Sequence, residues 1–129
     1  MAEVVKNKPQ ELTKAELEIM QVIWQKEKVL VHDILAELPE PKPAYNTVST
    51  IVRILENKGF VSHKEYGRTY EYFPVVAKED YTNTYMRTVL DNFFEGSISR
   101  MVNFFSAQKS ISLEETDEIM KILNGDSDI

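Results

Sequence analysis

The sequence has no cysteine and only four glycines among its 129 residues. Without cysteine the chain cannot form disulfides, thiolate metal sites or a cysteine nucleophile, and nothing ties it to an oxidising compartment. No stretch approaches the roughly 20 apolar residues of a membrane span, and the N-terminal residues lack the apolar run of a secretory signal. We therefore expect a cytoplasmic protein that does not insert into a membrane.

Positive charge is also scarce, because 15 Lys and Arg residues stand against 21 Asp and Glu residues. The net charge of −6 argues against a nucleic-acid partner, since only cations that face phosphates release counterions. The acidity is nevertheless uneven. Between Lys42 and Tyr70 five basic residues outnumber two acidic ones, whereas from Ala77 onward ten acidic residues outnumber five basic ones. This distribution allows a local basic surface on an acidic chain.

No arrangement of residues typical of an enzyme is present. The sequence has no glycine-rich phosphate loop, no HExxH pair and no GxSxG turn. His32 and His63 are separated by a helix and a connector, and neither has an acid at metal-ligand spacing, which indicates surface or half-buried histidines. We assign no catalytic residue, no metal and no cofactor.

Helix and strand signals alternate over the first part of the chain. Thr13 and Glu16 have the spacing of a capping box, Gly59 follows a helical pattern, and Gly67 separates two β-prone runs. The expected elements are a helix over 13–24, a brief strand over 29–31, a helix over 31–38, a proline-rich connector over 39–43, a helix over 45–58, and strands over 60–65 and 69–73. This order is the winged helix-turn-helix plan, with the two strands forming the wing.

From Ala77 the pattern is helical throughout. Apolar stripes predict one long helix that stops near Gly96, a second over 97–106, and a third that begins at a capping box of Ser112 and Glu115. We therefore expect a mainly α fold with a small β-hairpin. Its parts are a flexible arm over 1–11, a winged-helix DNA-binding domain over 12–75 and a helical dimerisation domain over 76–129.

One face of the helix over 45–58 carries short hydrogen-bonding side chains and one guanidinium, with no acid before Glu56. Such a helix can approach base edges in the major groove, although a solvated face that is short of charge has the same composition. Two basic residues near the wing tip would lie over the DNA backbone, and they favour the DNA-binding interpretation of this helix. The predicted DNA-binding residues are Tyr45, Asn46, Thr47, Ser49, Thr50 and Arg53 on the helix, and Lys64 and Arg68 on the wing.

The C-terminal helices carry more aromatic residues than about fifty residues of isolated helix can bury. A second copy of the chain is the simplest partner, because twofold dimers dominate soluble oligomers and match palindromic operators. Folding back onto the winged helix as extra core is the alternative. The predicted dimer-interface residues are Tyr81, Tyr85, Val89, Phe93, Met101, Phe104 and Phe105.

The chain resembles the penicillinase repressor family, also called BlaI/MecI, from Leu12 to about Leu123. The resemblance lies in Leu12-Thr13 with Ile23-Trp24, in Asn46-Thr47-Val48-Ser49-Thr50, in Lys58-Gly59-Phe60-Val61, and in Tyr70-Glu71-Tyr72-Phe73-Pro74. Ser49 stands where some relatives have a basic residue, and Arg53 also differs from residues found in others. The copper-responsive CopY members carry Cys-x-Cys motifs that this chain lacks, so copper control is not implied.

The resemblance implies a homodimeric repressor that occupies a palindromic operator in double-stranded DNA and regulates antibiotic resistance. It also implies relief through a membrane sensor protease system, which leads to cleavage of an Asn-Phe bond in the penultimate helix. Asn103-Phe104 matches that bond by motif and position. The competing interpretation is a winged-helix module that binds another protein instead of DNA, and the acidic total favours it.

Overall fold

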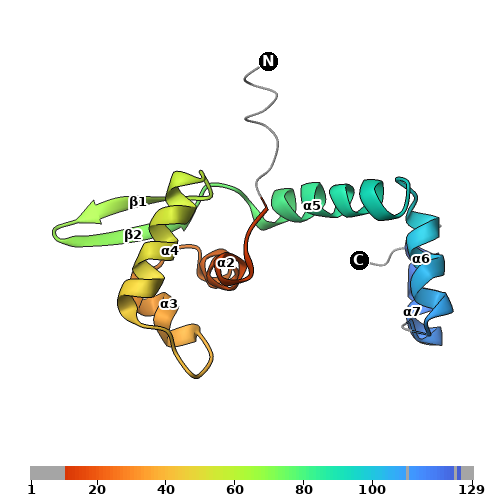
Figure 1. The fold of residues 1–129 in the computed structure, drawn as a ribbon, viewed down its shortest axis with the longest axis horizontal. Helices are drawn as coiled ribbons and strands as arrows, with labels where there is room; N and C mark the ends of the chain where they lie inside the picture. The colour runs from red at the N-terminus through yellow and green to blue at the C-terminus, as the bar shows by residue number, and fades with distance from the viewer. Residues whose placement is uncertain (1–10, 110, 124, 126–129) are drawn as a thin grey trace, which may run out of the picture. The chain divides into compact units, whose positions relative to one another are not determined.

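The computed structural model describes residues 11–109, 111–123 and 125. The expected N-terminal arm therefore lies outside the described residues, apart from Glu11. The contacts within the chain divide it into two compact units, one ending at Tyr85 and the other beginning at Met86. Each unit is described by itself below, and the elements carry the labels of Figure 1.

The first unit contains three helices and an antiparallel hairpin (Figure 1). Its elements are α2 (Lys14–Lys26), α3 (Val31–Glu37), α4 (Tyr45–Asn57), β1 (Val61–Tyr66), β2 (Thr69–Pro74) and the beginning of α5 (Lys78–Phe93). The predicted capping box at the start of α2 is confirmed. The Thr13 N–H donates to Glu16 Oε1 at 2.9 Å, and the Glu16 N–H donates to Thr13 Oγ1 at 3.1 Å.

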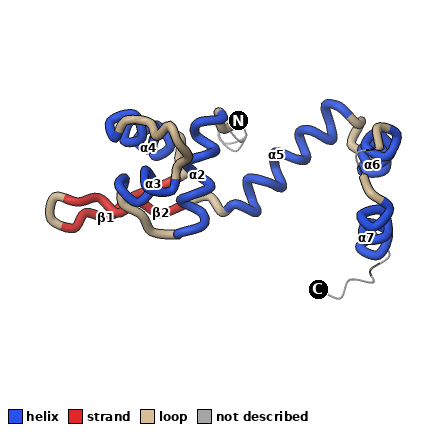
Figure 2. The backbone as a smooth tube through the Cα atoms, turned by 90° about the horizontal axis from the view of Figure 1, so that it is seen from below, coloured by secondary structure: helices blue, strands red, loops and turns tan. Residues whose placement is uncertain are grey.

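The core of this unit lies between the three helices and the hairpin, as the backbone path in Figure 2 also indicates. Each element contributes the apolar residues that its periodicity placed on one face. The fully buried side chains are Met20, Ile23, Val29, Ile34, Val48, Val52, Leu55 and Val61. Burial of each such side chain contributes about 1.5–3 kcal/mol, so this cluster fixes the orientation of α4 and of the hairpin.

The predicted strand over 29–31 is wrong in its extent. Only Val29 pairs, through a single antiparallel bridge in which its N–H and C=O bond to Tyr72 at 2.9 and 2.7 Å. Val31 already begins α3, because the Asp33 carboxylate accepts from the Leu30 N–H at 2.9 Å and caps that helix. A strong local capping signal therefore outweighs the β preference of two branched residues.

The start of α5 belongs to the first unit, which extends beyond the domain boundary expected after Val75. Trp24 Nε1 donates to the Val76 carbonyl at 2.9 Å, and the Tyr81 hydroxyl accepts from the Leu12 N–H at 2.9 Å. The Tyr81 ring also packs against Trp24 and Phe60, with centroid distances of 6.1 and 5.7 Å. Tyr81, predicted at the dimer interface, thus packs on the core of its own winged helix.

The second unit is helical, as expected. It contains the end of α5, α6 (Ile98–Ala107) and α7 (Leu113–Leu123), with Ser97 capping α6 and the predicted Ser112 and Glu115 capping box starting α7. The Gly96 N–H returns to the Leu90 carbonyl at 2.8 Å, which closes the end of α5. In the part of the chain that the structure describes, no helix is long and apolar enough to cross a membrane.

Candidate nucleic-acid interface

Helix α4 has one buried face and one exposed polar face. Val48, Val52 and Leu55 are fully buried and hold the helix against the core. The opposite face presents the predicted DNA-binding residues to solvent, with Asn46, Thr47, Thr50 and Arg53 exposed, Tyr45 43% exposed and Ser49 half-buried. Five of the six predicted residues on α4 are thus exposed to solvent, and Ile54 is an exposed apolar residue of the same helix.

The first turn of α4 is electropositive. Its N-cap residue, Ala44, has no side chain that could accept a hydrogen bond from the helix, and no acid lies in the first turn. Because the first internal bond of the helix is that from the Val48 N–H to the Ala44 carbonyl, the N–H groups of Tyr45, Asn46 and Thr47 have no partner inside the helix. Such a helix end favours an anion through its N–H groups and its dipole.

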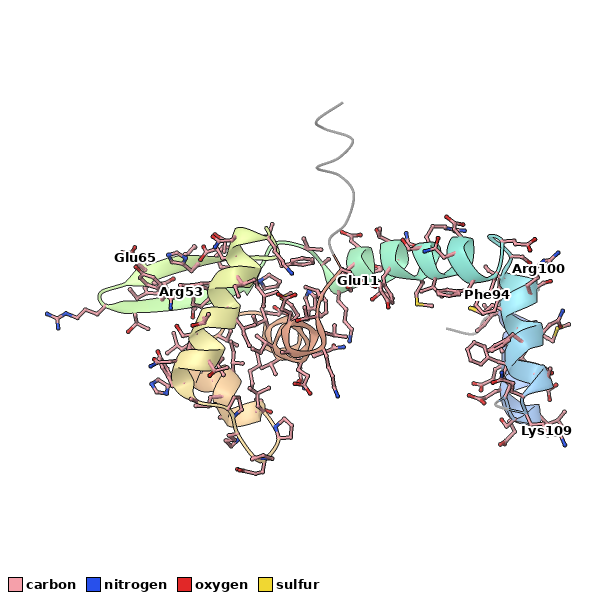
Figure 3. All side chains as sticks on the ribbon, viewed as in Figure 1. Glu11, Arg53, Glu65, Phe94, Arg100 and Lys109 are labelled. Atoms are coloured by element: carbon pink, nitrogen blue, oxygen red, sulfur yellow. The ribbon has the colours of Figure 1, made fainter. Side chains whose placement is uncertain are left out.

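The wing is a hairpin with a tight turn. Tyr66 pairs with Thr69, so the loop contains just Gly67 and Arg68, one residue fewer than the sequence suggested. Gly67 has φ +63°, a backbone conformation that is unfavourable for residues other than glycine. Lys64 and Arg68 are exposed near this turn, where Figure 3 also shows Glu65.

His63 joins the wing to the end of α4. Its Nδ1 lies 2.7 Å from Glu56 Oε2, and its ring stacks on Tyr70 at a centroid distance of 4.3 Å. The neighbouring Tyr72 is 4% exposed. Burial raises the pKa of the Tyr72 hydroxyl, Glu56 adds to the increase, and Arg53 opposes it. These contacts join the C-terminal part of α4 to the hairpin.

A groove between α3, α4 and the wing brings some of the predicted residues together. It is lined by Leu30, Val31, His32, Tyr45, Ser49, Arg68, Thr69, Tyr70 and Tyr72. Tyr45, Ser49 and Arg68 were predicted from the sequence, whereas the other polar residues were not. His32 packs on the Tyr45 ring at a centroid distance of 4.7 Å. Helical spacing cannot reveal this pair, because the two residues lie on different helices.

Two of the five basic residues between positions 42 and 70 are engaged within the protein. The Lys42 ammonium donates to the carbonyls of Leu35, Ala36 and Leu38 at 3.0, 3.1 and 2.7 Å, which caps the C-terminal end of α3. The Lys58 ammonium is bonded to Glu16. The expected basic surface therefore depends on Arg53, Lys64 and Arg68.

The second unit leaves most of its apolar side chains uncovered. Among its described residues Leu90 alone is buried. Of the predicted interface residues, Tyr85, Phe93, Phe104 and Phe105 are 38%, 75%, 46% and 40% exposed, and Val89 and Met101 are half-buried. A further groove between α6 and α7 is lined by Ile98, Ser99, Val102, Asn103, Thr116, Ile119 and Met120. Of these residues the sequence prediction included only Asn103, as part of the candidate cleavage bond.

Comparisons with known proteins agree with this architecture. The family model of the penicillinase repressor matches residues 12–125. The penicillinase repressor of Bacillus licheniformis is 31% identical over 114 residues, which cover 88% of this chain and 89% of that protein. The methicillin resistance regulatory protein MecI of Staphylococcus aureus strain N315 is 27% identical over 119 residues, covering 92% of this chain and 97% of that protein.

A solved structure supports the fold of the first unit. The solution structure of the DNA-binding domain of the repressor BlaI superposes with a TM-score of 0.50 at 32% sequence identity, covering 58% of this chain and 92% of that domain. The order of helices and hairpin predicted from the sequence is thereby confirmed as a winged helix. The chain belongs to the penicillinase repressor family, a family of transcriptional repressors and not of enzymes.

Proposed function

We propose that this repressor binds a palindromic operator as a homodimer, with α4 in the major groove and the wing over the DNA backbone. The observation that carries the proposal is the exposed face of α4, where Asn46, Thr50 and Arg53 offer hydrogen-bonding groups and a guanidinium. No acid lies in the first turn, and Ile54 is an exposed apolar residue of the same helix. The major groove admits a helix with such short side chains. The similarity to a domain described as the DNA-binding domain of BlaI supports the same role.

The residues expected to contact base edges are spaced along this face of α4. Asn46, Thr50 and Arg53 lie at helical spacing and are all exposed. An arginine pairs in bidentate fashion with guanine, and an asparagine pairs with adenine. Seven residues of helix span about 10 Å, or about three base pairs at 3.4 Å each. We therefore expect an adenine and a guanine at about that separation in each half-site.

The exposed apolar side chains of the second unit support a dimer. Its exposed apolar residues include Phe93, Phe104 and Leu113, the last with 80% of its surface exposed. A unit this short that buries one side chain in its described part has too little core to be stable alone. A second copy of the same unit would cover these side chains and would place two winged helices on the two halves of a palindrome.

A charge substitution tests the dimer in the complete chain. Phe93→Glu is expected to convert the dimer into a monomer, because it places a carboxylate where apolar surface is buried between copies. Asn92→Glu on the same helix is the matched control, since Asn92 is also exposed. Sedimentation equilibrium of the two variants decides the matter. A wild-type chain that sediments as a monomer, or a Phe93→Glu chain that stays dimeric, would overturn the assignment.

DNA binding itself is tested by a mobility shift with the DNA upstream of the chain's own gene. The affinity is expected to fall steeply as salt rises, since phosphate contacts release counterions. A shift that is equally strong with an unrelated duplex would contradict operator recognition. Both measurements use the whole 129-residue chain without added metal.

Relief of repression is proposed to act through the dimer. Asn103 and Phe104 are exposed within α6, and Asn103 also lines the groove that α6 forms with α7. Cleavage of the Asn103-Phe104 bond would separate α7 from the first part of α6 and remove one wall of that groove. Mass spectrometry of the chain from cells exposed to the inducing compound should then find a fragment ending at Asn103, and the Asn103→Ala variant should stay intact. An uncut wild-type chain during induction would rule out this route.

A further inference from the structure

The groove between α4 and the wing has the chemistry of an anion site. We propose that it binds one backbone phosphate of the operator, held by His32, Tyr45 and Tyr70 together with Arg68. The inference rests on the proposed function, because it assumes that α4 and the wing face DNA. It adds His32 and Tyr70 to the interface and places them with Tyr45 and Arg68 around one phosphate.

Apart from the apolar Leu30 and Val31, the side chains that line the groove can donate hydrogen bonds. Tyr45, Ser49, Thr69 and Tyr70 carry hydroxyls, Arg68 carries a guanidinium, and no carboxylate lines the groove. A phosphodiester offers acceptor oxygens and one negative charge, so it needs such partners. Tyr45 and Tyr70 are 43% and 44% exposed, which leaves their rings accessible to a ligand of this size.

The aromatic side chains are already held in place. The Tyr45 ring packs on His32 at 4.7 Å, and the Tyr70 ring stacks on His63 at 4.3 Å. His63 is itself fixed by Glu56 at 2.7 Å. Because these contacts restrict the rotamers before any ligand arrives, binding loses little side-chain entropy.

The backbone adds to the same site. Tyr45 is the first residue of α4, whose opening N–H groups are not capped by a side chain of the described chain. The positive end of the helix dipole therefore lies beside the groove. With α4 in a major groove and the wing over the adjacent backbone, the strand that crosses between them brings a phosphate to this position.

The test combines the neutralisation of single phosphates with the removal of two tyrosine hydroxyls. Each operator phosphate is replaced in turn by a methylphosphonate, and the affinities of the wild-type chain and the Tyr45→Phe/Tyr70→Phe variant are compared. The variant keeps both ring contacts and loses two hydroxyls, and we expect a loss of about 3- to 10-fold on the unmodified operator. At one phosphate in each half-site, neutralisation should reduce the affinity of the wild type more than that of the variant. The fold loss of the wild type should be at least about 3 times the fold loss of the variant. His32→Ala should show coupling to the same phosphate.

Tyr66→Phe is the matched control, because Tyr66 is 57% exposed on the wing but does not line the groove. It should show no coupling to the phosphate that the groove residues share. Additive losses at every phosphate for all groove variants would overturn the proposal while operator binding itself stands. Tyrosine ring signals that shift with inorganic phosphate alone, without coupling to any operator phosphate, would assign the groove to a small anion and also overturn it. A wild-type chain that does not bind the operator would instead refute the proposed function.

Discussion

The ammonium group of Lys58 lies 2.9 Å from Oε1 and 3.0 Å from Oε2 of Glu16. Lys58 is the C-cap residue of α4, while Glu16 lies in the first turn of α2 and forms its capping box with Thr13. One carboxylate, 6% exposed as a residue, thus joins the end of the proposed recognition helix to the start of the first helix. The pair fixes α4 in the core and withdraws Lys58 from any role in binding DNA.

Replacing Glu16 is expected to destabilise the fold. Burial alone raises the pKa of this carboxyl, but the bonds from Lys58 and from the Thr13 N–H outweigh burial and lower the pKa overall. A glutamate whose folded pKa is lowered contributes stability above its unfolded pKa, about 4.3, and loses it as the pH falls through the lower folded value. Glu16→Gln should reduce the free energy of unfolding by about 1–3 kcal/mol at pH 7.

The difference in the free energy of unfolding between wild type and Glu16→Gln should therefore shrink as the pH falls below the pKa of an unfolded glutamate. Urea unfolding at pH 7 and at acid pH measures it. Glu18→Gln, at an exposed position of the same helix, serves as the control and should change stability little. A gap between wild type and Glu16→Gln that stays constant down to acid pH would show that the charge of Glu16 is not what stabilises α2 and α4.

Arg53 should contribute to operator affinity and not to folding. Its side chain is exposed on α4, as Figure 3 shows, and fills no part of the core. Arg53→Ala should weaken operator binding by about 1–3 kcal/mol and relax the preference for guanine at one position. Its thermal midpoint should match that of the wild type. Unchanged affinity for the operator would remove Arg53 from the interface.

Lys64 and Arg68 should position the protein on DNA without reading sequence. Both are exposed on the wing. Replacing both by Ala should weaken operator and unrelated duplexes about equally and should make the slope of log K against log salt shallower by about 0.9 for each lost contact. Anisotropy titrations at several salt concentrations provide that slope. If the double variant lost sequence preference and kept its salt slope, the assignment of these residues to the backbone would be wrong.

Local signals in the sequence predicted most of the fold. The capping boxes at Thr13 and Ser112, the apolar face of α4 and the glycine of the wing turn act over a few residues, so they can be read without knowing the rest of the chain. The brief strand over 29–31 could not be predicted correctly, because its pairing depends on Tyr72 in a distant strand.

The parts of the site that the sequence did not reveal all depend on tertiary contacts. Composition counted Lys42 as part of a basic surface, yet its ammonium caps α3. The predicted dimer interface includes Tyr81, and the pattern did not reveal that its ring also packs on Trp24. His32 had the character of an ordinary surface histidine, and its place in the groove beside Tyr45 emerges only when two helices are brought together.

Two copies of the chain are proposed to bind one palindrome, each through α4 and the wing. Titration of the whole chain against duplexes with two intact half-sites and with one intact half-site measures this stoichiometry and the contribution of the second half-site. We expect two chains on each intact palindrome. The affinity should fall by up to about 10²–10⁴ when one half-site is destroyed, because the linked second module no longer contributes. Binding of one chain to each duplex, or equal affinity for both duplexes, would contradict it.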